Sequence, residues 1–166
     1  MKKSLILLFI ICSCLSLNAQ ENQALELDSD NDLINDKYDK CPNTPDGVCV
    51  DKDGCTQKIK RVVSFNSASY SIDEKDIKKV ENIVEIAKEC FGYKILLKGH
   101  TDSTYLGNYN LTLSKQRVDS LKKLLIQNKI DKNRINIEWY GETSPISTNV
   151  TKEGRETNRR VEVIFK

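Results

Sequence analysis

The 166-residue sequence has little of what several common functions require. It contains a single histidine, His100. One histidine, with no cysteine or second histidine at ligand spacing, cannot form a zinc cluster. The net charge is only +2, and the basic residues are scattered along the C-terminal part. The sequence therefore lacks the basic patch typical of a nucleic-acid-binding protein, and we expect no nucleic-acid partner.

The sequence also has no long apolar run. The apolar stretch from Leu5 to about Leu17 is well short of the roughly 20 residues that a membrane-spanning helix needs. With the two lysines before it and Leu17-Asn18-Ala19-Gln20 after it, this stretch predicts a signal peptide over residues 1–19. A lipoprotein signal is one alternative, because Ile11-Cys12-Ser13-Cys14 is an imperfect lipobox. A retained membrane anchor is another alternative. The signal peptide and the lipoprotein signal both predict export from the cytoplasm.

Charge is distributed unevenly after the signal. Residues 20–55 hold ten acidic residues and three lysines, whereas residues 56–166 hold 21 basic and 14 acidic residues. This asymmetry predicts two units, which we take as an acidic segment (28–55) after a linker (20–27), and a basic domain (56–166). The acidic segment has too few large apolar residues to form a core, so it needs a metal, a disulfide or both.

Four cysteines remain after the signal: Cys41, Cys49, Cys55 and Cys90. In an exported protein they are expected to be oxidised, and three full pairings are possible. We predict a Cys41–Cys55 bridge, since these residues bracket a turn-rich stretch and the bridge contributes about 3 kcal/mol. Pairing of Cys49 with Cys90 stays open, because Cys90 at the end of a helix also suits a buried free thiol.

The domain alternates strand and helix patterns. Ser71 and Glu74, at capping-box spacing, are expected to open the first helix. Alternating apolar residues predict strands over residues 61–65, 93–98, 135–140 and 160–165. Apolar residues at helical spacing predict two helices. The first carries Ile77, Val80, Ile83, Val84 and Ala87, and the second carries Val118, Leu121, Leu124 and Leu125. The order favours an α+β sandwich, with helices packed on one face of a mixed sheet.

Acidic side chains recur at regular spacing in residues 28–39. Positions 1, 3, 5, 9 and 12 of this run are occupied by Asp28, Asp30, Asp32, Asp36 and Asp39. Such oxygen clusters suit Ca²⁺, which takes six to eight oxygen ligands. The run, followed by Cys41-Pro42, resembles a thrombospondin type 3 repeat, which implies calcium as a cofactor. Leu33 occupies the position usually held by glycine, so a residue that resists positive φ must make the turn. The alternative is a solvated acidic linker without metal.

A set of spaced motifs covers nearly the whole domain. They are Gly99-His100-Thr101-Asp102-Ser103, Asn110, Leu113-Ser114-Lys115-Gln116-Arg117, Gly141-Glu142, Pro145, Asn149, Gly154-Arg155 and Asn158-Arg159-Arg160-Val161-Glu162. In order and spacing they resemble the OmpA-like, peptidoglycan-associated domain family. The resemblance implies a βαβαββ sandwich that binds peptidoglycan.

The resemblance also implies particular site residues. The ligand is the free end of diaminopimelate in the stem peptide, with Asp102 taking its ammonium and Arg117 its carboxylate. Three further residues line the site: Asn110, Asn66 and Arg159. The chain departs from the family at Thr104-Tyr105-Leu106, where glycine is usual soon after the aspartate.

Arg117 stands out on physical grounds as well. It lies on the apolar stripe of its helix, four residues before Leu121 and eight before Leu125. We expect it in or near the first turn, where the helix dipole disfavours a cation. A charge there needs an anionic partner. That partner is either Asp102, in an internal salt bridge, or the carboxylate of a zwitterionic ligand that Asp102 and Arg117 hold together.

His100 close to Asp102 raises a catalytic alternative, with Ser103 or Ser114 as nucleophile. No glycine-framed elbow surrounds either serine, so we expect His100 to be a structural, hydrogen-bonding residue. Arg160 is expected to fix the last strand by an ion pair.

Together these patterns predict a non-catalytic peptidoglycan-binding module. It would be periplasmic, associated with the outer membrane through a lipid anchor or a partner protein, and would tie the envelope to the cell wall. The alternatives are a calcium-dependent structural or adhesion protein, in which residues 28–55 are the functional part, and a cell-wall hydrolase.

Overall fold

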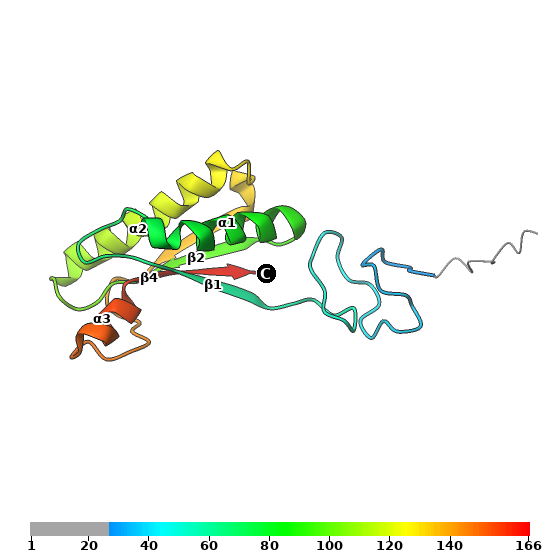
Figure 1. Cartoon of the computed structure of the whole chain (residues 1–166), viewed down its shortest axis with the longest axis horizontal. Coiled ribbons are helices and arrows are strands. Elements are labelled where there is room, and N and C mark those ends of the chain that lie inside the picture. Colours follow the sequence, from blue (N-terminus) through cyan, green and yellow to red (C-terminus); the bar gives the residue numbers. More distant parts are fainter. Residues whose placement is uncertain (1–26) are drawn as a thin grey trace, which may run out of the picture.

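Figure 1 shows the computed structural model, which describes residues 27–166. The predicted signal peptide (1–19) and nearly all of the predicted linker (20–27) lie outside the described residues. Among residues 27–166, no helix is long and apolar enough to cross a membrane.

A four-stranded mixed sheet forms the framework of the domain. Its strands are β1 (Ile59–Ser64), β2 (Ile95–Gly99), β3 (Ile135–Trp139) and β4 (Arg160–Phe165), in the spatial order β1-β4-β2-β3. β4 runs antiparallel to both neighbours, whereas β2 and β3 are parallel. The predicted strands are all present, and the bounds of the last one are confirmed. The mixed α+β architecture is also confirmed.

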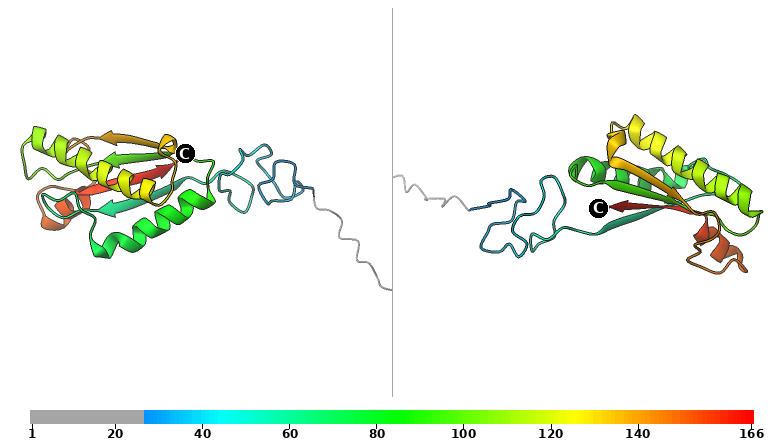
Figure 2. Two further views of the ribbon diagram at one scale, coloured as in Figure 1. Left: turned by 90° about the horizontal axis from the view of Figure 1, so that it is seen from above. Right: turned by 180° about the vertical axis from the view of Figure 1, so that it is seen from behind.

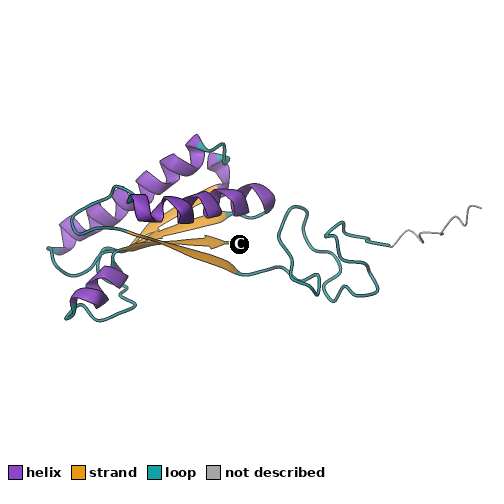
Figure 3. Cartoon of the chain, in the orientation of Figure 1, coloured by secondary structure: helices purple, strands orange, loops and turns teal. Residues whose placement is uncertain are grey.

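Two long helices cover one face of the sheet (Figures 1 and 3). They are α1 (Glu74–Glu89) and α2 (Gly107–Gln127). The predicted capping box is wrong: α1 begins after Asp73, and the hydroxyl of Ser71 pairs with that of Ser69 instead. Two short helices escaped the sequence analysis, α3 (Lys152–Asn158) and the 3₁₀ helix η1 (Lys132–Arg134). Both are shorter than the two or three turns that a periodic pattern needs to be recognised.

The core lies between the two helices and the inner face of the sheet. It comprises, among others, Val63, Val80, Ile83, Ala87, Ile95, Leu97, Val118, Leu121, Leu125, Val161 and Val163. Burying each large aliphatic side chain contributes about 1.5–3 kcal/mol. Gly99 lets α2 cross β2 closely, since a Cβ there would lie 2.3 Å from the Ser114 carbonyl oxygen. This close approach sets the distance between α2 and the end of β2.

Residues 27–58 form a loop-rich segment at the end of the sheet opposite α3 (Figures 1 and 2). Cys41 is joined to Cys55, as predicted. Cys90 is not a free thiol: it is bonded to Cys49, which ties the segment to the end of α1. The Tyr93 hydroxyl adds a second tie, 2.9 Å from the Cys49 carbonyl oxygen.

Candidate functional site

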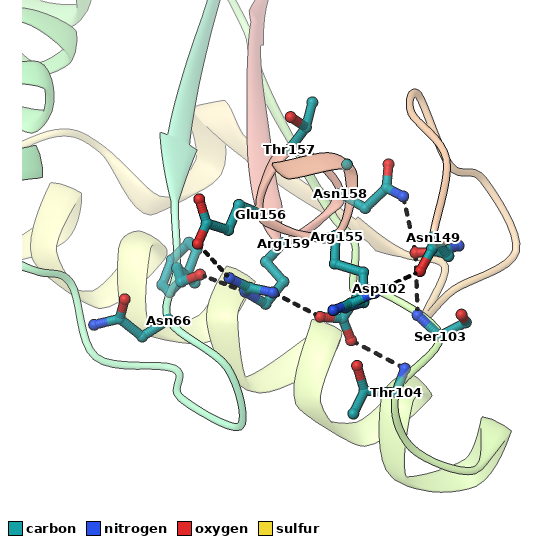
Figure 4. Close-up of polar contacts among 12 residues, drawn as sticks. Asn66, Asp102, Ser103, Thr104, Asn149, Arg155, Glu156, Thr157, Asn158 and Arg159 are labelled. Carbon is teal, nitrogen blue, oxygen red and sulfur yellow. Dashed lines mark hydrogen bonds and ion pairs between the residues drawn. The ribbon is translucent and has the colours of Figure 1, made fainter. Parts of the chain in front are cut away.

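Asp102 lies in the loop that leads from β2 to α2, and its side chain is almost completely buried (Figure 4). One carboxylate oxygen accepts a hydrogen bond from Arg159 Nη1 at 2.8 Å. The other accepts the backbone N–H of Thr104 at 3.1 Å. Burial alone would raise the pKa of Asp102, but the bonds from Arg159 and Thr104 outweigh it and lower the pKa below its ordinary value. Asp102 is therefore a buried carboxylate that stays ionised.

Arg117 lies in the middle of α2 rather than in its first turn, so the dipole argument was wrong. Its guanidinium donates three hydrogen bonds to main-chain carbonyl oxygens, those of Ser69 (2.8 Å), His100 (2.8 Å) and Asn66 (2.9 Å). The internal salt bridge with Asp102 is also wrong, since Arg159 occupies that position. Burial lowers the pKa of Arg117 to about 10, which leaves the side chain charged at neutral pH.

The loop that covers Arg117 follows β1 and spans residues 66–70. Two of its carbonyl oxygens, those of Asn66 and Ser69, bind the guanidinium. Between them Ala68 has a φ of 51°, a left-handed conformation that a non-glycine residue rarely adopts. The Asn66 side chain donates to Asp73, the residue that precedes α1. Arg117 thus holds a strained loop over the site.

Asn110 is fully buried in the first turns of α2. Its Nδ2 donates to the Tyr105 carbonyl oxygen at 2.7 Å, while its Oδ1 has no hydrogen-bond partner. The buried hydroxyl of Thr101 also lacks a partner. Buried polar atoms are nearly always satisfied, so the Asn110 oxygen and the Thr101 hydroxyl are open to a further hydrogen-bond partner.

The loop after Asp102 is fixed from the side of α3. The Ser103 amide donates to Asn149, which also accepts a hydrogen bond from the buried Asn158 at the end of α3 (Figure 4). Asn158 further binds the main chain of Ile146 and Ser147. These hydrogen bonds give a structural role to Asn149 and Asn158, two of the spaced residues of the sequence motifs.

A cavity of about 500 Å³ is lined by two predicted site residues, Asn66 and Arg159, the second of which binds Asp102. Its other walls come from the end of β1, from α1 and from α3, and carry Ser64, Phe65, Lys75, Lys79, Glu153, Glu156 and Thr157. None of the charged residues among them was singled out from the sequence. The glutamates lie on α3, which had not been recognised, and the lysines resemble any solvated helix face.

The structure therefore brings four of the five predicted site residues, Asn66, Asp102, Arg117 and Arg159, into one connected set of contacts. Asp102 binds Arg159, whose Nε binds the Phe65 carbonyl oxygen next to Asn66. Asn66 in turn binds Arg117 through its carbonyl oxygen. The fifth, Asn110, is linked to this set through the loop of residues 102–110, by way of Tyr105.

His100 does not have the geometry of a catalytic base. The expected hydrogen bonds are absent: neither ring nitrogen has a partner, and the ring stacks on Tyr140 at 5.3 Å. Burial, with Arg160 nearby, lowers the pKa of His100 to about 4, so the ring is neutral at pH 7. Ser114 is engaged elsewhere, with the Leu111 carbonyl and the Gly141 amide.

Arg160 forms the ion pair expected of it. Its guanidinium lies 2.8 Å from the carboxylate of Glu162, and both side chains are buried. This pair closely matches the Asp102–Arg159 pair in distance and burial.

In the acidic segment, Asp28, Asp30 and Asp32 offer oxygens that lie within 4.8 Å of one another. Asp30 Oδ1 and Asp32 Oδ2 are buried without a hydrogen-bond partner. Asp39 lies near Asp32 across Gly54, while Asp36 turns away to bind Ser29. Leu33 has a φ of 74°, as its place in the run requires. Burial and repulsion from Asp30, Asp39 and Asp28 raise the pKa of Asp32, against the hydrogen bond from Ile34.

Comparison with known families identifies the domain. The model of the OmpA family matches residues 64–159, which is more than half of the chain. The chain belongs to the OmpA family. The OmpA-family match contains all five predicted site residues.

Other OmpA-type proteins align over longer stretches. The chain is 36% identical over 141 residues to outer membrane porin F of Pseudomonas aeruginosa, which covers 81% of this chain and 40% of the porin. It is 27% identical over 119 residues to the peptidoglycan-binding protein ArfA of Mycobacterium tuberculosis, covering 71% of this chain and 36% of that protein. The chain thus spans well under half the length of these two relatives.

A solved structure shows the same OmpA-type fold. The peptidoglycan-associated lipoprotein from Burkholderia pseudomallei superimposes with a TM-score of 0.61 at 22% identity, and the match covers 64% of this chain and 90% of that one. This similarity confirms the predicted fold of helices on a mixed sheet.

Proposed function

We propose that this protein binds peptidoglycan non-covalently and ties the bacterial envelope to the cell wall. The observation that carries the proposal is the ionised, buried Asp102, which is close to the buried Arg117 and is held by Arg159, a residue that lines a polar cavity. A buried carboxylate with unpaired polar neighbours suits a ligand ammonium. The relative ArfA is named as a peptidoglycan-binding protein, which supports the same ligand here.

The ligand we propose is the zwitterionic end of diaminopimelate in the stem peptide. Its ammonium binds Asp102, and its carboxylate binds Arg117. A guanidinium carries five N–H groups, and three of those of Arg117 are used by carbonyl oxygens. The remaining two suit a carboxylate. Because Arg117 is fully buried, residues 66–70 must move aside for contact, which also releases the bonds of Arg117 to the Asn66 and Ser69 carbonyl oxygens. The strain at Ala68 lowers the cost of that movement.

Arg159, Asn66 and Asn110 complete the proposed site. Arg159 and Asn66 line the cavity, so they meet the peptide as it approaches. Asn110 Oδ1 is an unused acceptor for a ligand N–H group. The proposed role is binding without turnover, since His100 and Ser114 make no contact with each other that would activate a nucleophile.

Asp102→Asn tests the site, because it keeps the shape of the side chain and one of its two acceptor oxygens but removes its charge. In the full chain it should weaken sedimentation with diaminopimelate-type peptidoglycan by roughly 10- to several-hundred-fold. Glu162→Gln is the matched control, since Glu162 also forms a buried pair with an arginine at 2.8 Å. It should cost similar stability and leave binding unchanged.

Affinity is compared at a temperature where thermal melts show both variants folded. Unchanged binding by folded Asp102→Asn would falsify the site assignment. Soluble fragments released from the wall by repurified protein would replace the binding function with a hydrolase.

For export, we propose that residues 1–19 are removed as a signal peptide and that the mature protein stays in the periplasm. Association with the outer membrane would then need a partner protein, whereas a lipid anchor would require cleavage before Cys12 or Cys14, so that this cysteine becomes the N-terminus. A mass measurement of the mature N-terminus distinguishes the two: an N-terminus at Gln20 supports the soluble form, and a lipid-modified cysteine supports the lipoprotein.

We also propose that residues 28–39, as a thrombospondin type 3-like repeat, bind Ca²⁺ through Asp28, Asp30, Asp32, Asp36 and Asp39. The unpaired, buried oxygens of Asp30 and Asp32 support a cation at their centre. Bound calcium would neutralise carboxylates that otherwise repel one another. Asp36 would have to exchange its bonds with Ser29 for the cation or for a bound water.

Calorimetric titration of the full chain with CaCl₂ tests this second proposal. We expect heat of binding and slower proteolysis within residues 28–55, with no change in the rest of the domain. Absence of both effects at millimolar calcium leaves the segment as a disulfide-stabilised acidic linker. If calcium removal abolished wall binding, the acidic segment would instead be the functional part.

A further inference from the structure

Three large side chains are exposed together next to the proposed peptidoglycan site. Tyr105, Leu106 and Tyr109, here named the aromatic lip, are 43%, 85% and 46% exposed. The two tyrosine rings contact each other, with centroids 4.8 Å apart and planes tilted by 52°. Clustered apolar side chains on a protein surface are typical of an interaction site.

Local structure gives no reason for the aromatic lip. Leu106 occupies the position before α2, where serine, threonine, aspartate or asparagine would satisfy the first amides of the helix. No side chain makes a capping hydrogen bond there. Leu106 also covers no core, since most of its surface faces solvent. Leu106 therefore stabilises neither the helix nor the core, and its side chain is available to contact a ligand.

The aromatic lip is rigidly connected to the proposed site. Immediately before it, the Thr104 amide binds the Asp102 carboxylate. Within it, the Tyr105 carbonyl oxygen accepts a hydrogen bond from Asn110 at 2.7 Å. Tyr109 is close enough to Arg117 to influence the pKa of that side chain. A ligand held at Asp102 and Arg117 therefore extends past the aromatic lip or beside it.

We propose that the aromatic lip is a second subsite, which stacks on a sugar ring of the glycan that carries the bound stem peptide. This inference rests on the proposed function. Peptides in peptidoglycan are attached to glycan strands, so a peptide anchored at Asp102 brings a sugar close to the protein. The C–H groups on one face of a sugar ring suit the electron-rich ring faces of Tyr105 and Tyr109. Their two hydroxyl groups suit sugar hydroxyl and acetamido groups, which a purely aliphatic partner lacks.

The test compares two soluble ligands on the full chain by calorimetry. One is a disaccharide-peptide from the cell wall, and the other is the same peptide after an amidase has removed the sugar. We expect the wild type to bind the disaccharide-peptide roughly 3- to 10-fold more tightly. Tyr105→Ser should lose this preference and bind the free peptide like the wild type.

Two variants serve as controls. Tyr105→Phe keeps the ring and should keep most of the preference for the sugar-bearing ligand. Tyr38→Ser removes another exposed tyrosine, in the acidic segment at the opposite end of the sheet, and should bind both ligands like the wild type.

Two outcomes overturn the sugar subsite: a wild type that binds both ligands equally, or a Tyr105→Ser variant that weakens both equally. In the second case the aromatic lip contacts the peptide instead. Asp102→Asn separates this inference from the proposed function, because it should weaken both ligands. If it weakens neither, the proposed peptide site fails, whatever the result with Tyr105.

Discussion

Arg117 and Arg134 make the same contact at opposite ends of β2. Each guanidinium donates three hydrogen bonds of 2.8–3.0 Å to three main-chain carbonyl oxygens. Arg117 binds the loops that surround the proposed site. Arg134 binds the last turn of α1 and the turn that leads from it to β2, at the other end of that strand. The chain thus contains a natural control for the structural part of the role of Arg117.

Arg117→Lys and Arg134→Lys should therefore lose similar stability, about 2–4 kcal/mol in urea unfolding. A lysine keeps the charge but cannot reach three carbonyl oxygens at once. Only Arg117→Lys should also lose peptidoglycan binding, by at least about tenfold in the folded protein. Equal affinities for the two folded variants would show that Arg117 is structural and does not contact the ligand.

The disulfide that joins the acidic segment to the domain should matter more for stability than the one within the segment. Replacing Cys49 and Cys90 with alanine opens a loop of sequence separation 41 and should cost about 4 kcal/mol in urea unfolding. Replacing Cys41 and Cys55 should leave unfolding of the domain nearly unchanged, because both residues lie in residues 28–55. Peptide mapping without reduction checks the pairing, and free thiols on any of the four cysteines would contradict it.

Leu33→Gly should tighten calcium binding if the proposed site forms. Leu33 has a φ of 74°, which costs a non-glycine residue about 1 kcal/mol and costs glycine almost nothing. Relief of this strain corresponds to roughly fivefold in affinity, measurable by calorimetric titration. Val150→Gly, another exposed aliphatic residue without positive φ, is the control. Weaker or unchanged calcium binding by Leu33→Gly would contradict the prediction.

Stability should fall between pH 7 and pH 5 because of His100. The folded protein holds the pKa of His100 at about 4, mainly through burial, whereas an unfolded histidine has a pKa of about 6.5. As the pH falls below 6.5, the unfolded state binds a proton that the folded state does not, so folding is disfavoured. The expected loss is roughly 2 kcal/mol between pH 7 and pH 5 in urea unfolding. His100→Gln should remove this slope, since the chain has no other histidine.

Much of the fold was predictable because it depends on repeating patterns. Alternating apolar residues identified β4 to the residue, and helical spacing identified α1 and α2. The start of α1 was misplaced, because Ser71 and Asp73 are both good caps and only the path of the loop decides between them. The seven residues of α3 are too few for a helical apolar pattern to be recognised, so the two glutamates of α3 that line the cavity were not predicted.

By itself the sequence determined the family, the order of the strands and the two long helices, the residues offered to the site and the positive φ at Leu33, because each depends on residue type at a fixed spacing. Only the tertiary structure decided which partner each group takes. It paired Asp102 with Arg159, gave Arg117 three carbonyl oxygens, bonded Cys90 to Cys49 and left the ring nitrogens of His100 without hydrogen bonds. The physical reason is that the possible partners are equivalent in the sequence, since every residue has a carbonyl oxygen and several arginines carry the same charge. The choice among such equivalent partners depends on which of them the packed helices and loops bring within about 3 Å.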